Sequence, residues 1–248
     1  MRRHKSEDFF GVQLAGTHPE SFAKCCEIIE QNADFDFLDI NLGCPIDLIC
    51  NKGAGSALLE RRSRLRGIVN GAVNVLDCPV TVKLRTGITD KKIAHHLIPL
   101  FQSWNVSACT LHGRSKQQRY TKLADWEYIK TCSELTDPSK MSFFGNGDVF
   151  NPEDMDKVYD SGNFAGAMIG RGALIKPWIF TELKTKQLWD ISANERFDML
   201  KKFSNFGLEH WFVLSLTKGA LIHRGLIKPE SSCVNGLVSF AGTFLSGL

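Results

Sequence analysis

The sequence lacks several features that define common protein classes. Its first residues contain no apolar stretch of the kind found in secretory signals. None of its eight cysteines forms a Cys-x-x-Cys pair, and their spacings match no zinc site. Collagen-like repeats and the composition of disordered proteins are also absent. We therefore expect a reduced, intracellular globular protein without a metal site, in the cytoplasm and also in the nucleus.

Acidic side chains are almost missing from the C-terminal part of the chain, residues 212–248, where Glu230 is the only one. Residues 231–248 carry no charge at all, and a stretch of that length approaches the span of a membrane helix. Three glycines, several serines and Asn235 interrupt the stretch, which argues against a spanning helix. We therefore expect no membrane association.

What the chain does contain is ordinary for a globular protein. It has 248 residues, 43% of them hydrophobic and 23% charged, which is enough for one large domain or for a barrel with a small appendage. The net charge of +3 suits an anionic ligand without requiring one. Composition therefore narrows the class of protein but leaves its function open.

Short β-rich runs alternate with longer amphipathic segments along most of the chain. Such alternation predicts an α/β fold built from parallel βα units, in which each strand is followed by a helix. The predicted strands are residues 10–15, 37–40, 80–84, 108–111, 142–144 and 166–169. The predicted helices are residues 20–31, 57–75, 91–104, 126–134, 152–160, 178–189 and 193–211.

Polar side chains recur at or just past the end of each predicted strand. In a parallel sheet these ends meet at one edge, where barrels and doubly wound sheets bind their ligands. One polar residue in such a place is usually a cap or a turn, but six consecutive units with the same arrangement indicate a site. The residues concerned are Gln13, Asn41, Cys44, Lys83, Arg85, His112, Arg114, Asn146, Asp148 and Arg171.

Cys44 stands in the segment Asn41-Leu42-Gly43-Cys44-Pro45, directly after a predicted strand. We expect Gly43 to allow a tight turn or a positive φ, and Pro45 to bias Cys44 away from a helical conformation. These constraints would fix the backbone conformation at Cys44 and thereby the direction in which its thiol points. The alternative is that Cys44 is a small buried hydrophobe, because free cysteine is among the most buried residue types.

Two pairs of basic residues follow one another at the strand ends. Lys83 and Arg85 are two residues apart in a strand and therefore share a face, which suits an anion or an electron-rich ring. His112 and Arg114 repeat the arrangement one unit later, placing a side chain that titrates near neutral pH beside a bidentate donor. A solvated strand end is the alternative for either pair taken alone.

Glycines are closely spaced in two later loops, residues 145–148 and 169–174, each of which leads into a helix. Glycine lets backbone amides approach a phosphate, and many barrels bind phosphate after their last two strands. One such loop is weak evidence, but two on consecutive units favour a phosphate site. Residues 52–55 form another glycine segment, consistent with a loop that reshapes around a substrate.

In combination, these motifs resemble the tRNA-dihydrouridine synthase family over residues 8–211. Segment 41–45 followed by segment 53–59 looks like the family signature. The segments that follow in the family's order are Val12-Gln13-Leu14, Thr81-Val82-Lys83, Leu111-His112-Gly113-Arg114, 145–148 and 169–174. The segments that resemble the eukaryotic branch, which modifies uridine-47 of tRNA, are 44–48, 118–126 and 207–211.

The resemblance implies a (β/α)8 TIM barrel that binds FMN, uses NADPH or NADH as reductant and takes tRNA as its partner. The flavin would reduce a uridine to 5,6-dihydrouridine by giving hydride to C6, while Cys44 protonates C5. The resemblance further implies that Asn41, Arg85 and Arg114 contact the substrate. The implied cofactor contacts are Gln13, Lys83 and His112 at the flavin, and Asn146, Gly147, Asp148, Gly170 and Arg171 on the phosphate side.

The sequence departs from the family pattern at both ends. The family barrel has two strands before the first one found here, so we expect six strands where a closed barrel needs eight, with open sheet edges. From Phe212 onward, the chain no longer resembles the helical region of the family. We therefore expect an FMN-binding catalytic barrel at residues 1–180, the start of a helical tRNA-binding domain at 181–211 and a divergent tail at 212–248.

Two alternatives to an active enzyme of this family stay open. The chain could be a catalytically impaired fragment that keeps the site residues but retains neither FMN nor tRNA. It could also be another FMN-dependent pyrimidine dehydrogenase. Flavin absorbance of the purified protein distinguishes an FMN-binding enzyme from the impaired fragment. An assay with free uracil distinguishes a tRNA-modifying enzyme from a pyrimidine dehydrogenase. Nothing in the sequence indicates the oligomeric state.

Overall fold

The computed structural model describes residues 3–4, 7–89, 91–159 and 162–223. The chain divides into two compact units, and their boundary in the sequence falls between Gln187 and Leu188. All six strands of the described residues lie in the first unit, and the second contains one long helix. Of the tail expected at 212–248, residues 224–248 are outside the described part of the chain.

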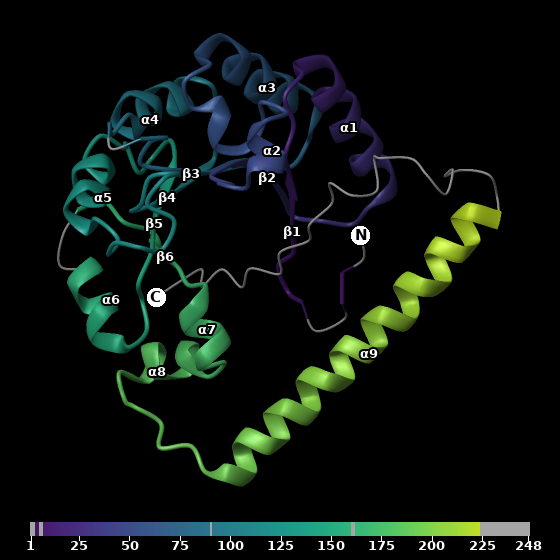
Figure 1. Ribbon diagram of the computed structural model, residues 1–248, viewed down its shortest axis with the longest axis vertical. Coiled ribbons are helices and arrows are strands. Elements are labelled where there is room, and N and C mark those ends of the chain that lie inside the picture. Colours follow the sequence, from purple (N-terminus) through teal and green to yellow (C-terminus); the bar gives the residue numbers. More distant parts are fainter. Residues whose placement is uncertain (1–2, 5–6, 90, 160–161, 224–248) are drawn as a thin grey trace. The chain divides into compact units, whose positions relative to one another are not determined.

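Six parallel strands form one sheet, in which the spatial order of the strands is their order in the sequence (Figure 1). All six predicted strands are confirmed, with shifts of no more than two residues at their ends. The strands are β1 (Gly11–Leu14), β2 (Phe37–Leu42), β3 (Val80–Arg85), β4 (Ala108–His112), β5 (Ser142–Asn146) and β6 (Gly166–Met168).

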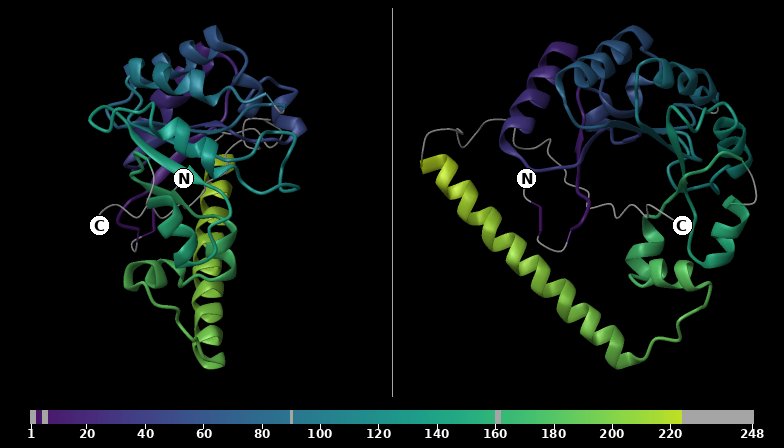
Figure 2. Two further views of the ribbon diagram at one scale, coloured as in Figure 1. Left: turned by 90° about the vertical axis from the view of Figure 1, so that its left-hand side faces the viewer. Right: turned by 180° about the vertical axis from the view of Figure 1, so that it is seen from behind.

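Helices follow the strands and form an arc outside the sheet in the first unit, as Figures 1 and 2 show. This arrangement repeats the βα unit and agrees with the expected TIM-barrel type. The helices after β1 to β5 are α1 (Pro19–Asn32), α3 (Arg62–Val75), α4 (Ala94–Ser103), α5 (Trp126–Ser133) and α6 (Pro152–Tyr159). Two short helices, α7 (Arg171–Ile175) and α8 (Ile179–Thr185), follow β6.

The strands separate apolar from polar side chains because successive residues of a strand point to opposite faces. On the face turned to the helices, the side chains join one hydrophobic core that includes Leu38, Ile40, Val82, Leu84 and Leu111. The residues between them are polar and share the other face, which we call the inner face. Its polar members on the first five strands are Gln13, Asp39, Asn41, Thr81, Lys83, Arg85, Thr110, His112, Ser142 and Asn146.

The strand register places these inner-face residues in rows. Asn41 is the register partner of Lys83, and Arg85 is the partner of His112, which in turn pairs with Asn146. Side chains of register partners point to the same face of a sheet, so residues far apart in the sequence become neighbours. The rows therefore bring residues from separate strand ends between β1 and β6 together on one face of the sheet.

The sheet is open between β1 and β6, each of which pairs with one neighbour only in the described residues. A closed barrel of this type has eight strands, so the six strands confirm the expectation of a partial barrel. Open strand edges expose unpaired backbone groups and are prone to pair with other chains.

Several local expectations need correction. The helix predicted over residues 57–75 is interrupted: a 3-10 turn, η1 (Gly55–Leu58), precedes α3, which begins at Arg62. A short helix, α2 (Asp47–Cys50), lies in the loop after Cys44 and was not predicted. Gly43 is not among the glycines with positive φ, which include Gly53, Gly55 and Gly147, so Gly43 does not supply the special backbone angle. The loop expected at 169–174 is mostly helical, because α7 begins at Arg171.

The second unit contains the helix α9 (Ala193–His223), which continues twelve residues beyond the predicted end at residue 211. Its described side chains, up to residue 208, include several exposed apolar ones, among them Phe197, Leu200, Phe203 and Phe206. Across the residues that the structure describes, no helix combines the length and the apolar character that a membrane crossing requires.

Candidate active site

A chain of hydrogen bonds crosses the inner face and ends at the backbone of Cys44. Asp39 accepts from Thr81 Oγ1 and from Gln13 Nε2, each at 2.7 Å. Gln13 Oε1 accepts from Asn41 Nδ2 at 2.8 Å, and Asn41 Oδ1 accepts from the amide of Cys44 at 2.9 Å. Because Asp39 accepts through both of its oxygens, it fixes the orientation of the Gln13 amide and, through it, that of Asn41. The buried carboxylate therefore determines which atom of Asn41 faces Cys44.

The carbonyl oxygen of Cys44 is held as firmly as its amide. It accepts from Ser56 Oγ at 2.9 Å, from the Ser56 amide at 3.2 Å and from Cys50 Sγ at 3.3 Å. Gly55, at φ +61°, passes so close that a Cβ on it would lie 3.0 Å from this oxygen. The Cys44 thiol itself makes no hydrogen bond among the described residues and is partly exposed, whereas Cys50 is buried. Cys44 is thus not a core residue: its backbone is fixed and its thiol is available.

Lys83 is the cation closest in register to Asn41. Burial lowers its pKa to about 8, with the charge of Asp39 opposing the shift and that of Arg85 adding to it. Burial raises the pKa of Asp39 above its ordinary value. Hydrogen bonds from Thr81 and Gln13 and the charge of Lys83 lower this pKa and offset part of the rise. The ammonium of Lys83 makes no hydrogen bond or ion pair to any described residue, so it remains free for a ligand.

Arg114 and Asp148 form a buried ion pair behind the mouth of the sheet. Arg114 Nη2 donates to both oxygens of Asp148, at 2.7 and 2.6 Å, and its Nε donates to the carbonyl of Lys122. Arg171 donates to the same carboxylate at 2.6 Å. Burial raises the pKa of Asp148, but these hydrogen bonds outweigh it and leave the pKa below its ordinary value. The structure places Arg114, at 2% exposure, as a support for Asp148.

His112 is neutral in this setting. Its pKa falls to about 2 because the ring is buried and because Lys83, Arg85 and Arg114 surround it with positive charge, with Asp148 opposing. Its Nε2 lies 3.3 Å from Arg114 Nη1. A guanidinium only donates, so Nε2 accepts and the ring proton sits on Nδ1. His112 therefore offers a neutral N–H donor to a ligand rather than a charge.

Arg85 connects the Cys44 segment to the loop after β4. Its Nε donates to the carbonyl of Gly43 at 2.8 Å, and its Nη1 donates to the carbonyl of Ser115 at 2.9 Å. The residue is 4% exposed, and its Nη2 has no hydrogen bond to a described residue. Arg85 thus holds the loop that carries Cys44 and retains the two N–H donors of Nη2 for a ligand.

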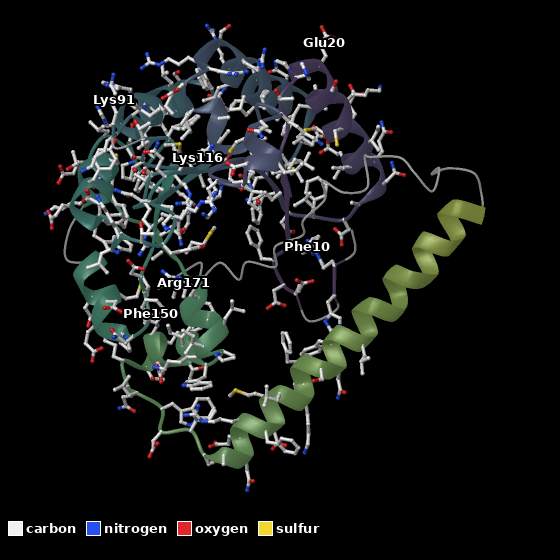
Figure 3. The ribbon with its side chains drawn as sticks, viewed as in Figure 1. Phe10, Glu20, Lys91, Lys116, Phe150 and Arg171 are labelled. Carbon is white, nitrogen blue, oxygen red and sulfur yellow. The ribbon has the colours of Figure 1, made fainter. Side chains whose placement is uncertain are left out.

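The loop after β4 brings aromatic and basic side chains over the site. The Arg171 guanidinium lies 4.6 Å from the centroid of the Tyr120 ring and 5.3 Å from that of Phe150, a cation–π geometry. Lys116 and Arg119 approach Asp47 of α2 at 3.8 and 3.7 Å. In Figure 3, Lys116 and Arg171 lie inside the helical arc, whereas Glu20 and Lys91 lie at its outer side.

The two glycine loops differ in the space around them. Gly147 has φ +129°, and a Cβ on it would lie 2.5 Å from Ala124, so packing alone requires glycine there. Its neighbour Asn146 donates through Nδ2 to the carbonyl of Met168 at 2.7 Å. A Cβ on Gly170 would meet nothing within 4 Å. The backbone at Gly170 is therefore the more open of the two to an approaching ligand.

Strand ends in the sequence indicated six of the ten polar inner-face residues and missed four, two of which, Asp39 and Thr81, belong to the hydrogen-bond network of the site. Asp39 and Thr81 were not candidates, although Asp39 precedes Asn41 by two residues and so shares its face. Ser56 was also missed, because a hydroxyl twelve residues from Cys44 gives no signal in the sequence. No group of three or more potential ligand side chains could hold a metal ion in the described part of the chain.

Comparison with known proteins matches residues 1–214 to a family described as Dihydrouridine synthase (Dus). A Xenopus tropicalis protein named tRNA-dihydrouridine(47) synthase (NAD(P)(+))-like is 53% identical over 212 residues, which are 85% of this chain and 33% of that protein. Proteins of the same name from Homo sapiens and Oryza sativa subsp. japonica are 50% and 49% identical, again over 85% of this chain. The chain thus spans about a third of the length of these curated relatives.

Among solved structures, an N-acetylneuraminate lyase from Mycoplasma synoviae aligns with a TM-score of 0.48 and 11% identity, over 89% of this chain and 82% of the lyase.

Proposed function

Since this chain belongs to the dihydrouridine synthase family, we propose that it carries the site for flavin-dependent reduction of a uridine in tRNA to 5,6-dihydrouridine. The observation that supports this most is the row formed by Asn41 and Lys83 beside Cys44. The row offers a free ammonium that feels the charge of Asp39, and it lies beside a free thiol whose backbone amide is linked to Asp39 through Asn41 and Gln13. A cation and a proton donor on one face are what a reduction of a conjugated carbonyl requires.

The inner face suits FMN. The free ammonium of Lys83 and the neutral N–H of His112 match an electron-rich ring with carbonyl oxygens, and Gln13 stands in the adjacent row. When bound, FMN would supply the hydride for C6 of the uracil, and NADPH or NADH would restore it. We assign the cofactor phosphate to the loops that contain Asn146 to Asp148, Gly170 and Arg171.

Cys44 is proposed to donate the proton for C5 of the uracil. In this step the S–H bond breaks, a C–H bond forms at C5, and the resulting thiolate takes a new proton from solvent. The step needs a thiol that keeps a defined position without being tied to a partner. The hydrogen bonds at the amide and the carbonyl of Cys44 provide the position, and the unbound thiol provides the proton.

Asn41 and Arg85 are proposed to orient the uracil. Both side chains contact the segment that carries Cys44, and the Nη2 donors of Arg85 remain available for a carbonyl oxygen. Hydrogen bonds that hold the ring at a fixed distance from thiol and flavin lower the barrier by positioning alone. Arg114 contributes indirectly, because it holds Asp148 and the tautomer of His112.

A transfer RNA substrate must present its uridine as a flipped base, because the site lies on the inner face of the sheet. Lys116 and Arg119 share the single carboxylate of Asp47, which leaves net positive charge near the mouth that would attract the phosphate backbone. We propose tRNA rather than a free pyrimidine on this basis, with uridine-47 as the position suggested by the names of the relatives.

The open edges of the sheet favour one alternative, a chain that keeps the site but holds FMN weakly. Purification followed by absorbance spectroscopy and FMN titration tests the proposal. We expect saturable FMN binding and, with NADPH present, dihydrouridine in tRNA but not reduction of free uracil. A protein that stays colourless at saturating FMN would contradict the proposal for this chain. Reduction of free uracil would indicate a pyrimidine dehydrogenase instead.

A further inference from the structure

Three arginines gather at the start of α3, and none of them has an acidic partner in the described part of the chain. Arg61, Arg62 and Arg64 make no hydrogen bond or ion pair to a described residue through their side chains. Together with Pro19 and Ser63 they line an open hollow of about 670 Å³. Clustered guanidinium groups repel one another unless an anion lies between them, so this arrangement is one that a ligand would stabilise.

The guanidinium groups of Arg61 and Arg64 approach the same point beside Gly53. A Cβ built on Gly53 would lie 3.3 Å from Arg61 Nη1 and 3.7 Å from Arg64 Nη1. It would also lie 3.1 Å from Thr17 Oγ1. Gly53 has φ +83° and carries no side chain to fill this space. Two cationic forks and one hydroxyl therefore face the same small volume.

The hydroxyl of Thr17 is an independent sign of a missing partner. Its Oγ1 is buried and has no hydrogen bond to any residue that the structure describes. Buried polar atoms in folded proteins nearly always have a partner, and an unsatisfied hydroxyl costs stability. A group that accepts hydrogen bonds at this point would satisfy Thr17 and neutralise the arginines together.

The cluster is close to the proposed proton donor along the chain and in space. Thr17 follows β1, and Gly53 belongs to the loop after β2 that begins at Cys44. Two residues later, Gly55 contacts the carbonyl of Cys44. The cluster thus lies at the carboxyl ends of β1 and β2, on the side of the sheet where the loops of the site are found.

We propose that Arg61, Arg64 and Thr17 form a phosphate-binding site that takes a backbone phosphate of the RNA substrate beside the reacting uridine. Arginine presents a planar fork that matches a phosphate, and two forks with a hydroxyl provide enough donors for its oxygens. This inference rests on the proposed function for the identity of the ligand, but the presence of an anion site does not. Arg62 lines the neighbouring hollow together with Arg61 and Arg64 and adds to the positive charge there.

A first experiment tests the anion site without RNA. Phenylglyoxal modifies accessible arginines, and inorganic phosphate should protect Arg61 and Arg64 while leaving Arg66, an exposed residue of the same helix, unprotected. The extent of modification is read by peptide mass spectrometry on the full chain. Equal protection of all three arginines, or protection of none, would show that no specific site exists.

A second experiment tests the RNA assignment. The double variant Arg61→Gln/Arg64→Gln should bind tRNA about tenfold more weakly. The logarithm of its association constant for tRNA should fall less steeply with the logarithm of the salt concentration. The slope should decrease in magnitude by about 0.7 to 0.9, the value for one phosphate contact. The matched variant Arg66→Gln removes a charge from the same helix and should change the affinity less than about twofold. Circular dichroism confirms that each variant is folded.

The outcomes distinguish the two proposals. Phosphate protection with unchanged tRNA affinity in the double variant would mean that the site takes free phosphate, and the RNA assignment would be wrong. If the double variant and Arg66→Gln weaken tRNA binding by the same factor for each positive charge removed, the effect is a general one of surface charge. That result would overturn the site. If the chain binds no tRNA at all, the proposed substrate fails, while the protection experiment still decides whether the anion site exists.

Discussion

Asn41 Oδ1 accepts a hydrogen bond from the backbone amide of Cys44 at 2.9 Å. This contact joins the sheet to the loop that carries the thiol. The orientation of the Asn41 amide depends on Gln13. Asn41 can present its oxygen to Cys44 only while Gln13 accepts a hydrogen bond from the Nδ2 atom of Asn41. Gln13 in turn is oriented by Asp39. The position of Cys44 therefore depends on a carboxylate three hydrogen bonds away.

The pH dependence of FMN binding should report the ionisation of Lys83. Below about pH 8 the side chain is protonated and attracts the electron-rich ring, and above it the charge is lost. We expect the dissociation constant for FMN to be flat below this value and to rise as the pH increases beyond it. Fluorescence titration between about pH 6.5 and 9 measures it. The variant Lys83→Met should bind weakly with no such dependence, and a wild-type dependence retained in this variant would remove Lys83 from the site.

Removal of the negative charge of Asp39 should shift that pH dependence. The carboxylate opposes the lowering of the Lys83 pKa, so Asp39→Asn should lower this pKa below about 8 and make FMN binding weaken at lower pH. Thr81→Val is the matched control, because it deletes a hydrogen bond to Asp39 but keeps the charge. FMN titrations of both variants provide the comparison. Identical pH profiles for the two would show that Asp39 acts only by packing.

Two glycines near Cys44 should respond differently to alanine. Gly55 has φ +61°, and a Cβ there would lie 3.0 Å from the Cys44 carbonyl, so Gly55→Ala should cost about 1–2 kcal/mol of unfolding free energy. A Cβ on Gly43 meets nothing closer than 3.5 Å, so Gly43→Ala should change the stability by less than about 0.5 kcal/mol. Urea unfolding of the two variants measures the difference. A larger loss for Gly43→Ala would contradict the described loop geometry.

The fold could be predicted from the sequence because each strand carries its own signal. Alternating residues such as Leu38, Asp39, Ile40 and Asn41 mark a strand with one apolar and one polar face. The interruption between η1 and α3 gives no comparable signal, since Leu59, Glu60 and Arg61 contain neither glycine nor proline.

The sequence indicated where the polar residues of the candidate site lie, but not which of them contact one another. Strand ends indicated Arg114 and Asp148 separately, yet their pairing joins residues 34 positions apart and depends on the register of β4 and β5. Gly43 was expected to turn the chain, whereas Gly55 has the positive φ next to Cys44. Local sequence shows where a polar residue lies, but tertiary packing decides what it contacts.

The formation of dihydrouridine by the FMN-loaded chain tests the central claim most directly. Unmodified tRNA, NADPH and the protein are incubated, and the nucleosides are analysed by mass spectrometry for the gain of two hydrogens. We predict that the wild type and Cys78→Ala produce dihydrouridine, and that Cys44→Ala produces none while its flavin is still reduced by NADPH. Wild-type product formation by Cys44→Ala, or no product from a wild type that binds FMN and oxidises NADPH, would contradict the account.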